Sequence, residues 1–144
     1  MLQAQPVPEN QWPERTRLLK LAAERAGAAD RFEPLDLAVT FDEAWHYGLP
    51  DPHAHSHSKE FINAHGKKQG TCVHLGNCDI GCDVGARNTL DLNYIARAEG
   101  HGAEVRPLHL ARIIEPTPAG YRVHFDRIED EALLPGEVSG RVVI

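Results

Sequence analysis

The sequence CVHLGNCDIGCDVGARNTLDLNY, residues 72–94, contains all three cysteines of the chain and three of its glycines. Glycine adopts backbone conformations that other residues avoid, so this spacing predicts a tightly turning loop. A helix is predicted directly after it, with Asn88 or Thr89 as the N-cap and with Gly100 and Gly102 ending it after Glu99. The stretch therefore predicts a glycine-rich turn that leads into a helix.

Two functions are open for Arg87 at the start of this helix. Helix N-termini bind anions such as phosphate, and Arg87 could face one. Alternatively, Arg87 pairs with Asp83 or Asp91 and has a structural function only. The sequence favours neither.

The cysteines raise the question of a metal site. Cys72, His74, Cys78 and Cys82 have the spacing C-x-H-x3-C-x3-C, which is not the paired CxxC spacing of common zinc sites. An iron-sulfur cluster normally needs four thiolates, and the chain has three. The favoured interpretation is that small thiols pack beside glycines. A small metal-binding module on these four residues stays as the alternative, and a binding domain without chemistry is a third possibility.

Three histidines alternate in the segment His53-Ala54-His55-Ser56-His57. In an extended strand their side chains would point the same way, which is suitable for a metal. Prolines and serines bracket the segment, so a solvated loop is the favoured interpretation.

Composition excludes some classes of partner. The chain of 144 residues has 42% hydrophobic residues and a net charge of −6, so no basic surface for nucleic acid or anionic membranes is expected. No apolar run approaches the roughly 20 residues of a membrane span. Three cysteines without a recognisable leader predict reduced thiols and, by default, a cytoplasmic protein.

The rest of the chain alternates helix and strand signals. Residues 1–12 are predicted to be a loop, Pro13 to begin a helix that Gly27 ends, and residues 37–41 to form a half-buried strand. Residues 104–114 are predicted to form a strand, with a turn at Thr117–Gly120 and a return strand from Tyr121. Residues 140–144, Gly-Arg-Val-Val-Ile, predict the opening of a buried strand that has no turn to finish it, and the chain is expected to be cut at both ends.

The order of several motifs resembles a known family. Residues 76–94 are followed by Ala98-Glu99, Gly102–Val105, Pro107–His109 and Tyr121–Val123. This succession is similar to the flavin-dependent glucose-methanol-choline oxidoreductases, and in particular to their cholesterol-oxidase-like branch. It thins out upstream of Gln69.

The resemblance implies an internal fragment of an FAD-dependent enzyme. The implied fold is a mixed α/β arrangement with short helices and a β-hairpin: residues 1–75 form part of a substrate-side domain, and residues 76–144 form part of a Rossmann-like FAD-binding domain. The implied activity is oxidation of a CH–OH group of a small-molecule alcohol or sterol-like substrate by hydride transfer to the flavin. The remaining segments of the same enzyme are the implied partners.

The resemblance assigns one cofactor-binding residue, Ala111. At this position, where the family commonly has valine, the backbone N–H and C=O pair with the adenine of FAD. No catalytic residue is assigned, because none of the nine histidines matches the catalytic motif of the family. The chain also lacks the GxGxxG turn that cradles the diphosphate of a dinucleotide, so tight flavin binding by this chain alone is not expected.

Overall fold

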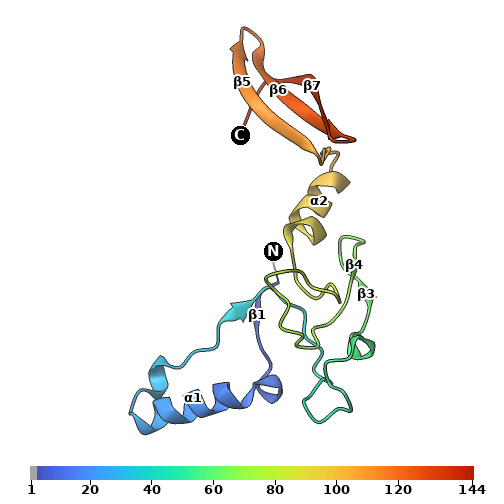
Figure 1. The fold of residues 1–144 in the computed structure, drawn as a ribbon. Coiled ribbons are helices and arrows are strands. Elements are labelled where there is room, and N and C mark those ends of the chain that lie inside the picture. Colours follow the sequence, from blue (N-terminus) through green and yellow to red (C-terminus); the bar gives the residue numbers. More distant parts are fainter. Residues whose placement is uncertain (1–2) are drawn as a thin grey trace. The chain divides into compact units, whose positions relative to one another are not determined.

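The computed structural model describes residues 3–144 and divides into two compact units, one ending at Ala103 and the other running from Glu104 to Ile144. Figure 1 shows their elements. The predicted domain boundary after residue 75 concerns a longer protein and stays a prediction. Among the described residues, neither α-helix combines the length and apolar composition needed to cross a bilayer.

The predicted first helix is confirmed as α1, Glu14–Arg25. Pro13 is its N-cap, where a missing N–H removes no helical hydrogen bond. Gly27 follows the helix with a φ of +66°, a conformation that glycine adopts without strain. No residue of α1 is buried, and the side chains of Leu18 and Leu19 are 55% and 62% exposed.

The other elements of the first unit are short. Two antiparallel pairs are formed by β1 (Gln5–Pro6) with β2 (Asp36–Leu37) and by β3 (Phe61–Ile62) with β4 (Lys68–Gln69). Four 3-10 turns cover Glu9–Gln11, Ala29–Arg31, His55–His57 and Leu90–Leu92. The predicted strand at residues 37–41 is thus reduced to β2, followed by a single bridge between Val39 and Arg87.

Long-range hydrogen bonds hold these loops together. Thr40 donates to the carbonyl of Ala86, and its own carbonyl accepts from Cys72, both at 2.8 Å. The small core contains Trp45, Val73 and Ala86, all at most 1% exposed. Buried amides are satisfied by one another: Gln69 Nε2 donates to Asn88 Oδ1 at 3.0 Å. Such pairing removes most of the cost of burying a polar group.

The second helix, α2 (Tyr94–Gly100), begins later than predicted. Thr89 is the N-cap of the preceding 3-10 turn, and Asn93 is the N-cap of α2, with its Oδ1 accepting from the N–H of Tyr94 at 2.6 Å. The Asn93 amide nitrogen also donates to the carbonyls of Asn88 and Thr89. These side-chain bonds compete with helical ones and interrupt the helix at Asn93.

The second unit is an antiparallel sheet in the order β5 (His109–Thr117), β6 (Gly120–Glu129) and β7 (Ala132–Gly140). The predicted hairpin is confirmed, but its first strand begins at His109, not at Glu104. The third strand was not predicted. The predicted strand opening at residues 140–144 is wrong, because β7 ends at Gly140 and Ile144 is fully exposed.

The two faces of this sheet differ in character. On one face Val123 lies between Ile114 and Val138, which remain 52% and 44% exposed. On the other face His124 lies between two carboxylates, 3.2 Å from Glu115 and 3.9 Å from Glu137.

The mixed α and β content of the chain, with short helices, is as predicted. Every strand pairing among residues 3–144 is antiparallel, so the Rossmann-like arrangement stays a prediction.

Candidate functional site

The three cysteines line one cavity of about 270 Å³ in the first unit. Its walls come from segments far apart in the sequence: the apolar residues Val7, Leu37 and Phe41 line it together with residues 72–78 and 81–82. The cysteine loop turns at Gly76 and Gly81, whose φ angles are +80° and +141°. A side chain would be strained at either position, which explains why the glycines stand there.

The three thiols have different surroundings. All are free, with Cys72 and Cys82 half-buried and Cys78 exposed. The Cys72 sulfur accepts the N–H of His74 at 3.3 Å, and the Cys82 sulfur accepts the N–H of Ala86 at 3.2 Å. Burial raises the pKa of the Cys72 thiol, and the neighbouring Cys78 and Cys82 add to this. Cys72 is therefore a neutral thiol near pH 7.

His74 is fixed from two sides. Its ring lies 4.2 Å from the Trp45 ring, between centroids, and its Nε2 lies 3.0 Å from Gln11 Oε1. The Gln11 amide nitrogen donates to the Asp42 carbonyl at 2.6 Å, so Oε1 is the atom that accepts from Nε2–H of His74. Burial, followed by the proximity of His53, lowers the pKa of His74. His74 is thus a neutral structural histidine whose proton lies on Nε2.

This arrangement does not support the metal alternative. Among the residues that the structure describes, no three histidine, cysteine or acidic side chains are placed to hold a metal ion. The Nε2 of His74 is already used by Gln11. Cys72, His74, Cys78 and Cys82 line one cavity. The favoured interpretation of thiols packed beside glycines fits the half-buried Cys72 and Cys82 in part but is wrong for the exposed Cys78.

The alternating histidines do not form a ligand set either. His55–His57 is a 3-10 turn, not an extended strand. His53 Nδ1 donates to the carbonyl of Val73 at 2.8 Å, and His57 Nε2 donates to that of Pro50 at 2.9 Å. His53 and His57 therefore tie two parts of the loop to the unit, while His55 Nε2 lies 3.7 Å from Asp83, in agreement with the predicted loop.

Arg87 also has a structural function. Its guanidinium donates to the carbonyl oxygen of Cys78 and so closes the cysteine loop. Neither of the predicted ion pairs, with Asp83 or with Asp91, is formed within residues 3–144. The anion-binding interpretation also weakens, since α2 begins seven residues later, at Tyr94.

Ala111 lies in the second unit, in the edge strand β5 opposite Phe125. The register of β5 shifts directly after it, so that Arg112 bulges out of the pairing and forms an ion pair of 2.6 Å with Asp126. An edge strand presents unpaired backbone N–H and C=O groups along its outer side. Ala111 is thus on a strand that has backbone groups available for a partner.

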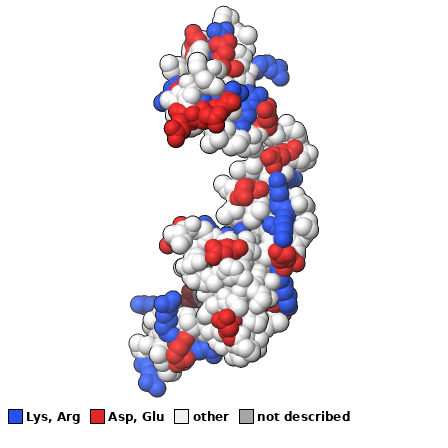
Figure 2. Space-filling model, turned by 45° about the vertical axis from the view of Figure 1, so that its right-hand side comes forward, with Lys and Arg blue, Asp and Glu red and all other residues white. Residues whose placement is uncertain are grey.

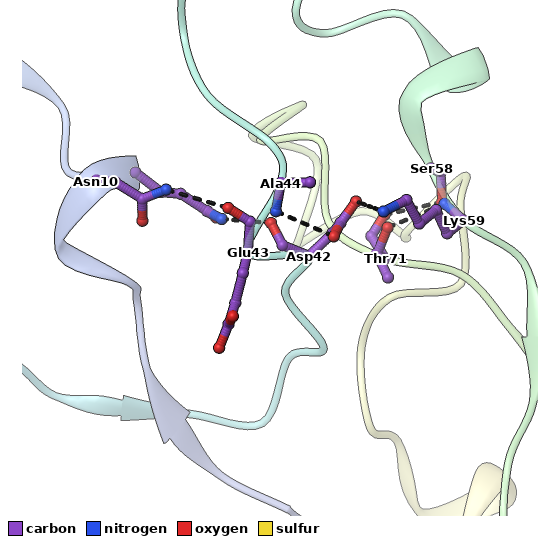
Figure 3. Close-up of polar contacts among 8 residues, drawn as sticks. Asn10, Asp42, Glu43, Ala44, Ser58, Lys59 and Thr71 are labelled. Carbon is purple, nitrogen blue, oxygen red and sulfur yellow. Dashed lines mark hydrogen bonds and ion pairs between the residues drawn. The ribbon is translucent and has the colours of Figure 1, made fainter.

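A polar network that the sequence did not reveal joins three loops of the first unit (Figure 3). Asp42 accepts from Lys59 at 2.8 Å and from the N–H of Ala44 at 3.1 Å. The N–H of Lys59 donates to Thr71 Oγ1 at 3.0 Å, and Ser58 Oγ donates to the Thr71 carbonyl at 2.8 Å. The network fixes the segment after β4 that leads to Cys72. Elsewhere, acidic and basic groups interleave on the face shown in Figure 2.

Asp42 should make stability depend on pH. Its hydrogen bond with Lys59, aided by Ala44 and opposed by burial, lowers the pKa of Asp42 below its usual 3.8. A carboxyl with a lowered folded-state pKa stabilises the fold above its unfolded pKa, and this contribution is lost as pH falls through the folded value. We expect Asp42→Asn to lower the free energy of unfolding at neutral pH by up to about 1 kcal/mol, since Lys59 is largely exposed.

Urea unfolding at a series of pH values measures this effect. The difference between Asp42→Asn and the unmodified chain should shrink toward zero as pH is lowered through the folded-state pKa of Asp42, which lies below the usual 3.8. Glu43→Gln is the matched control, because only the backbone carbonyl of Glu43 is bonded in this network. A difference that stays constant with pH, or one equal to that of the control, would show that the Asp42–Lys59 pair does not stabilise the fold.

Comparison with known proteins gives a partial match. No family model and no solved structure matches the chain significantly. Over 91 residues it is 36% identical to a protein from Acinetobacter baumannii named cholesterol oxidase, and over 96 residues it is 33% identical to proteins of that name from two strains of Mycobacterium tuberculosis. Part of this chain is similar to cholesterol oxidases.

The similarity to cholesterol oxidases covers 61% to 64% of the chain but only 15% of those proteins. The chain thus spans about 15% of the length of the curated relatives it matches. The match agrees with the resemblance inferred from residues 76–94.

Proposed function

We propose that this chain is part of an FAD-dependent oxidoreductase of the glucose-methanol-choline type that oxidises a CH–OH group of an alcohol or sterol-like small molecule. The observation that carries the proposal is the 33–36% identity to cholesterol oxidases over about three fifths of the chain. The motif order from Gly76 to Val123 agrees with it. In this proposal residues 1–75 belong to the substrate-side domain and residues 76–144 to the FAD-binding domain of a cytoplasmic enzyme.

The residues described here fit only one end of the cofactor. Ala111 lies on the edge strand β5, and an edge strand presents unpaired N–H and C=O groups along its outer side, which would suit the hydrogen-bonding edge of a base. The chain has no glycine-rich dinucleotide turn for the diphosphate. We therefore assign adenine binding to the backbone of Ala111, and we assign the diphosphate site and the catalytic base to other segments of the enzyme.

The exposed apolar side chains of this chain are consistent with coverage by other segments of the same enzyme. Leu18 and Leu19 of α1 are more than half exposed, as is Ile114 of β5. A monomeric protein rarely leaves contiguous apolar surface in water. We propose that other segments of the same enzyme cover these two surfaces.

The test uses the protein encoded by the reading frame that contains this chain. Ala111→Pro removes the backbone N–H, while Ala111→Val keeps it. We expect the proline variant to bind FAD about 2- to 12-fold more weakly, the effect of losing one neutral hydrogen bond of roughly 0.5–1.5 kcal/mol. Flavin absorbance per protein and FAD titration of the stripped enzyme measure this, with thermal unfolding as the control for folding.

The outcomes separate the parts of the proposal. Equal FAD affinity of the two variants would show that the Ala111 N–H does not bind the cofactor. A purified protein without flavin, which takes up none on titration, would overturn the FAD-dependent function as a whole.

The metal-binding alternative predicts stoichiometric zinc or iron that is lost in Cys78→Ser. The described residues offer no suitable ligand group, so the oxidoreductase is the better supported function.

A further inference from the structure

We propose that Cys78 and Cys82 form a thiol–disulfide exchange site that reacts with anionic low-molecular-weight disulfides of the glutathione type. The site is independent of the proposed oxidoreductase function. It stands on the convergence of all three thiols of the chain on one cavity, with one thiol exposed and two half-buried.

The turn that carries Cys78 brings it close to Cys82. The carbonyl of Asn77 accepts from the N–H groups of both Ile80 and Gly81, at 3.2 and 3.0 Å, so residues 77–81 form one compact turn. Cys82 follows this turn directly, and both thiols line the same cavity. Gly81 has nothing within 4 Å of the place where a Cβ would stand, which leaves room for the turn to adjust. Cys78 and Cys82 are thus four residues apart across one turn, and a disulfide between them requires their Cα atoms to lie within about 7 Å.

The surroundings give the two thiols different functions. Cys78 is exposed and can meet a disulfide from solution, so it is the attacking group. Cys82 is half-buried and lines the same cavity, so it is assigned the second attack, on the mixed disulfide. Cys72 is unsuited to be the second group, because its burial favours the uncharged thiol, and the thiolate is the nucleophile.

Arg15 sets the charge of the preferred reagent. It contributes to the lining of this otherwise largely apolar cavity and forms no ion pair within residues 3–144. A guanidinium binds carboxylates in a fork geometry. Oxidised glutathione carries carboxylates and suits this position, whereas a cationic disulfide such as cystamine does not.

The reaction proceeds in two exchange steps. The Cys78 thiolate attacks one sulfur of oxidised glutathione, forming a mixed disulfide and releasing one glutathione thiolate. The Cys82 thiolate then attacks the Cys78 sulfur, forming the Cys78–Cys82 disulfide and releasing the second glutathione. The two protein thiols are oxidised by two electrons, oxidised glutathione is reduced, and the two thiol protons end on the two glutathione molecules.

The experiment follows the mass of the reduced 144-residue chain with oxidised glutathione after acid quenching. We expect the unmodified chain and Cys72→Ser to lose two hydrogen atoms, with one disulfide. Cys82→Ser should stop with one glutathione attached at Cys78, and Cys78→Ser should form neither product at the early times. Thermal unfolding of each variant confirms that the fold is retained.

Three results would overturn the site. Loss of two hydrogens by Cys82→Ser, or failure of Cys72→Ser to lose them, would show that Cys72 is the second thiol. Equal reaction rates of the native chain and of the chain in urea would show that the fold creates no site.

The preference for an anionic reagent is tested by Arg15→Ala. We expect a several-fold slower reaction with oxidised glutathione but not with cystamine, and Arg15→Lys should restore most of the rate. An equal effect of Arg15→Ala on the reactions with both reagents would show that Arg15 does not select an anionic disulfide.

Discussion

Trp45→Ala is expected to destabilise the chain by about 3–5 kcal/mol, the usual cost of deleting a large buried aromatic side chain. Trp45 is 1% exposed, and its ring lies against those of Tyr47 and His74, at centroid distances of 4.9 and 4.2 Å. Its indole N–H donates to the Pro52 carbonyl at 2.7 Å. Because small domains are stable by only 5–15 kcal/mol, this loss removes a large part of the total.

Urea unfolding followed by circular dichroism measures the effect of Trp45→Ala. Trp45→Phe keeps the ring stacking but loses the hydrogen bond, so a smaller loss is expected. Ile80→Ala is the matched control, because Ile80 is 90% exposed and its truncation should change stability by less than about 0.5 kcal/mol. If Trp45→Ala and Ile80→Ala behave alike, Trp45 is not the centre of a packed core.

The elements predicted correctly are those with local signals. The helix α1 has a proline before it and a glycine after it, and the hairpin of β5 and β6 has its turn at Pro118 and Ala119. β7 was missed because Pro135 and Gly136 interrupt its apolar run. Proline is tolerated there because β7 is an edge strand, and Gly136 is needed because a Cβ would lie 2.6 Å from the Phe125 ring.

The later start of α2 has a long-range cause. Asn88 was predicted to be a helix cap from its local sequence, but its side chain accepts from Gln69 and Thr40, 19 and 48 residues away. Local propensity cannot reveal such partners. The same holds for the cavity: the cysteine spacing was visible in the sequence, but its apolar wall comes from Val7 and Leu37, and the partner of His74 is Gln11, 63 residues away.

Gly70→Ala is expected to destabilise the chain by about 1–3 kcal/mol, the range for overpacking a tightly packed site. A Cβ at residue 70 would lie 2.3 Å from the carbonyl oxygen of Val84 and 2.5 Å from Ser58 Oγ. The serine hydroxyl can rotate, but the carbonyl belongs to the backbone and must shift. Such a shift would separate the segment after β4 from the loop that holds Cys82.

The matched control for this prediction is Gly100→Ala at the end of α2. No atom lies within 4 Å of a Cβ at residue 100, and the position is helical, so alanine should be neutral or stabilise by up to about 1 kcal/mol. Urea unfolding compares the two variants, and the reaction rate of Cys82 with a thiol reagent reports on the loop. A faster reaction at Cys82 in Gly70→Ala alone is expected, because the displaced loop exposes its half-buried thiol. Unchanged stability and an unchanged Cys82 rate in Gly70→Ala would show that the close approach of the backbones at Gly70 does not hold this loop in place.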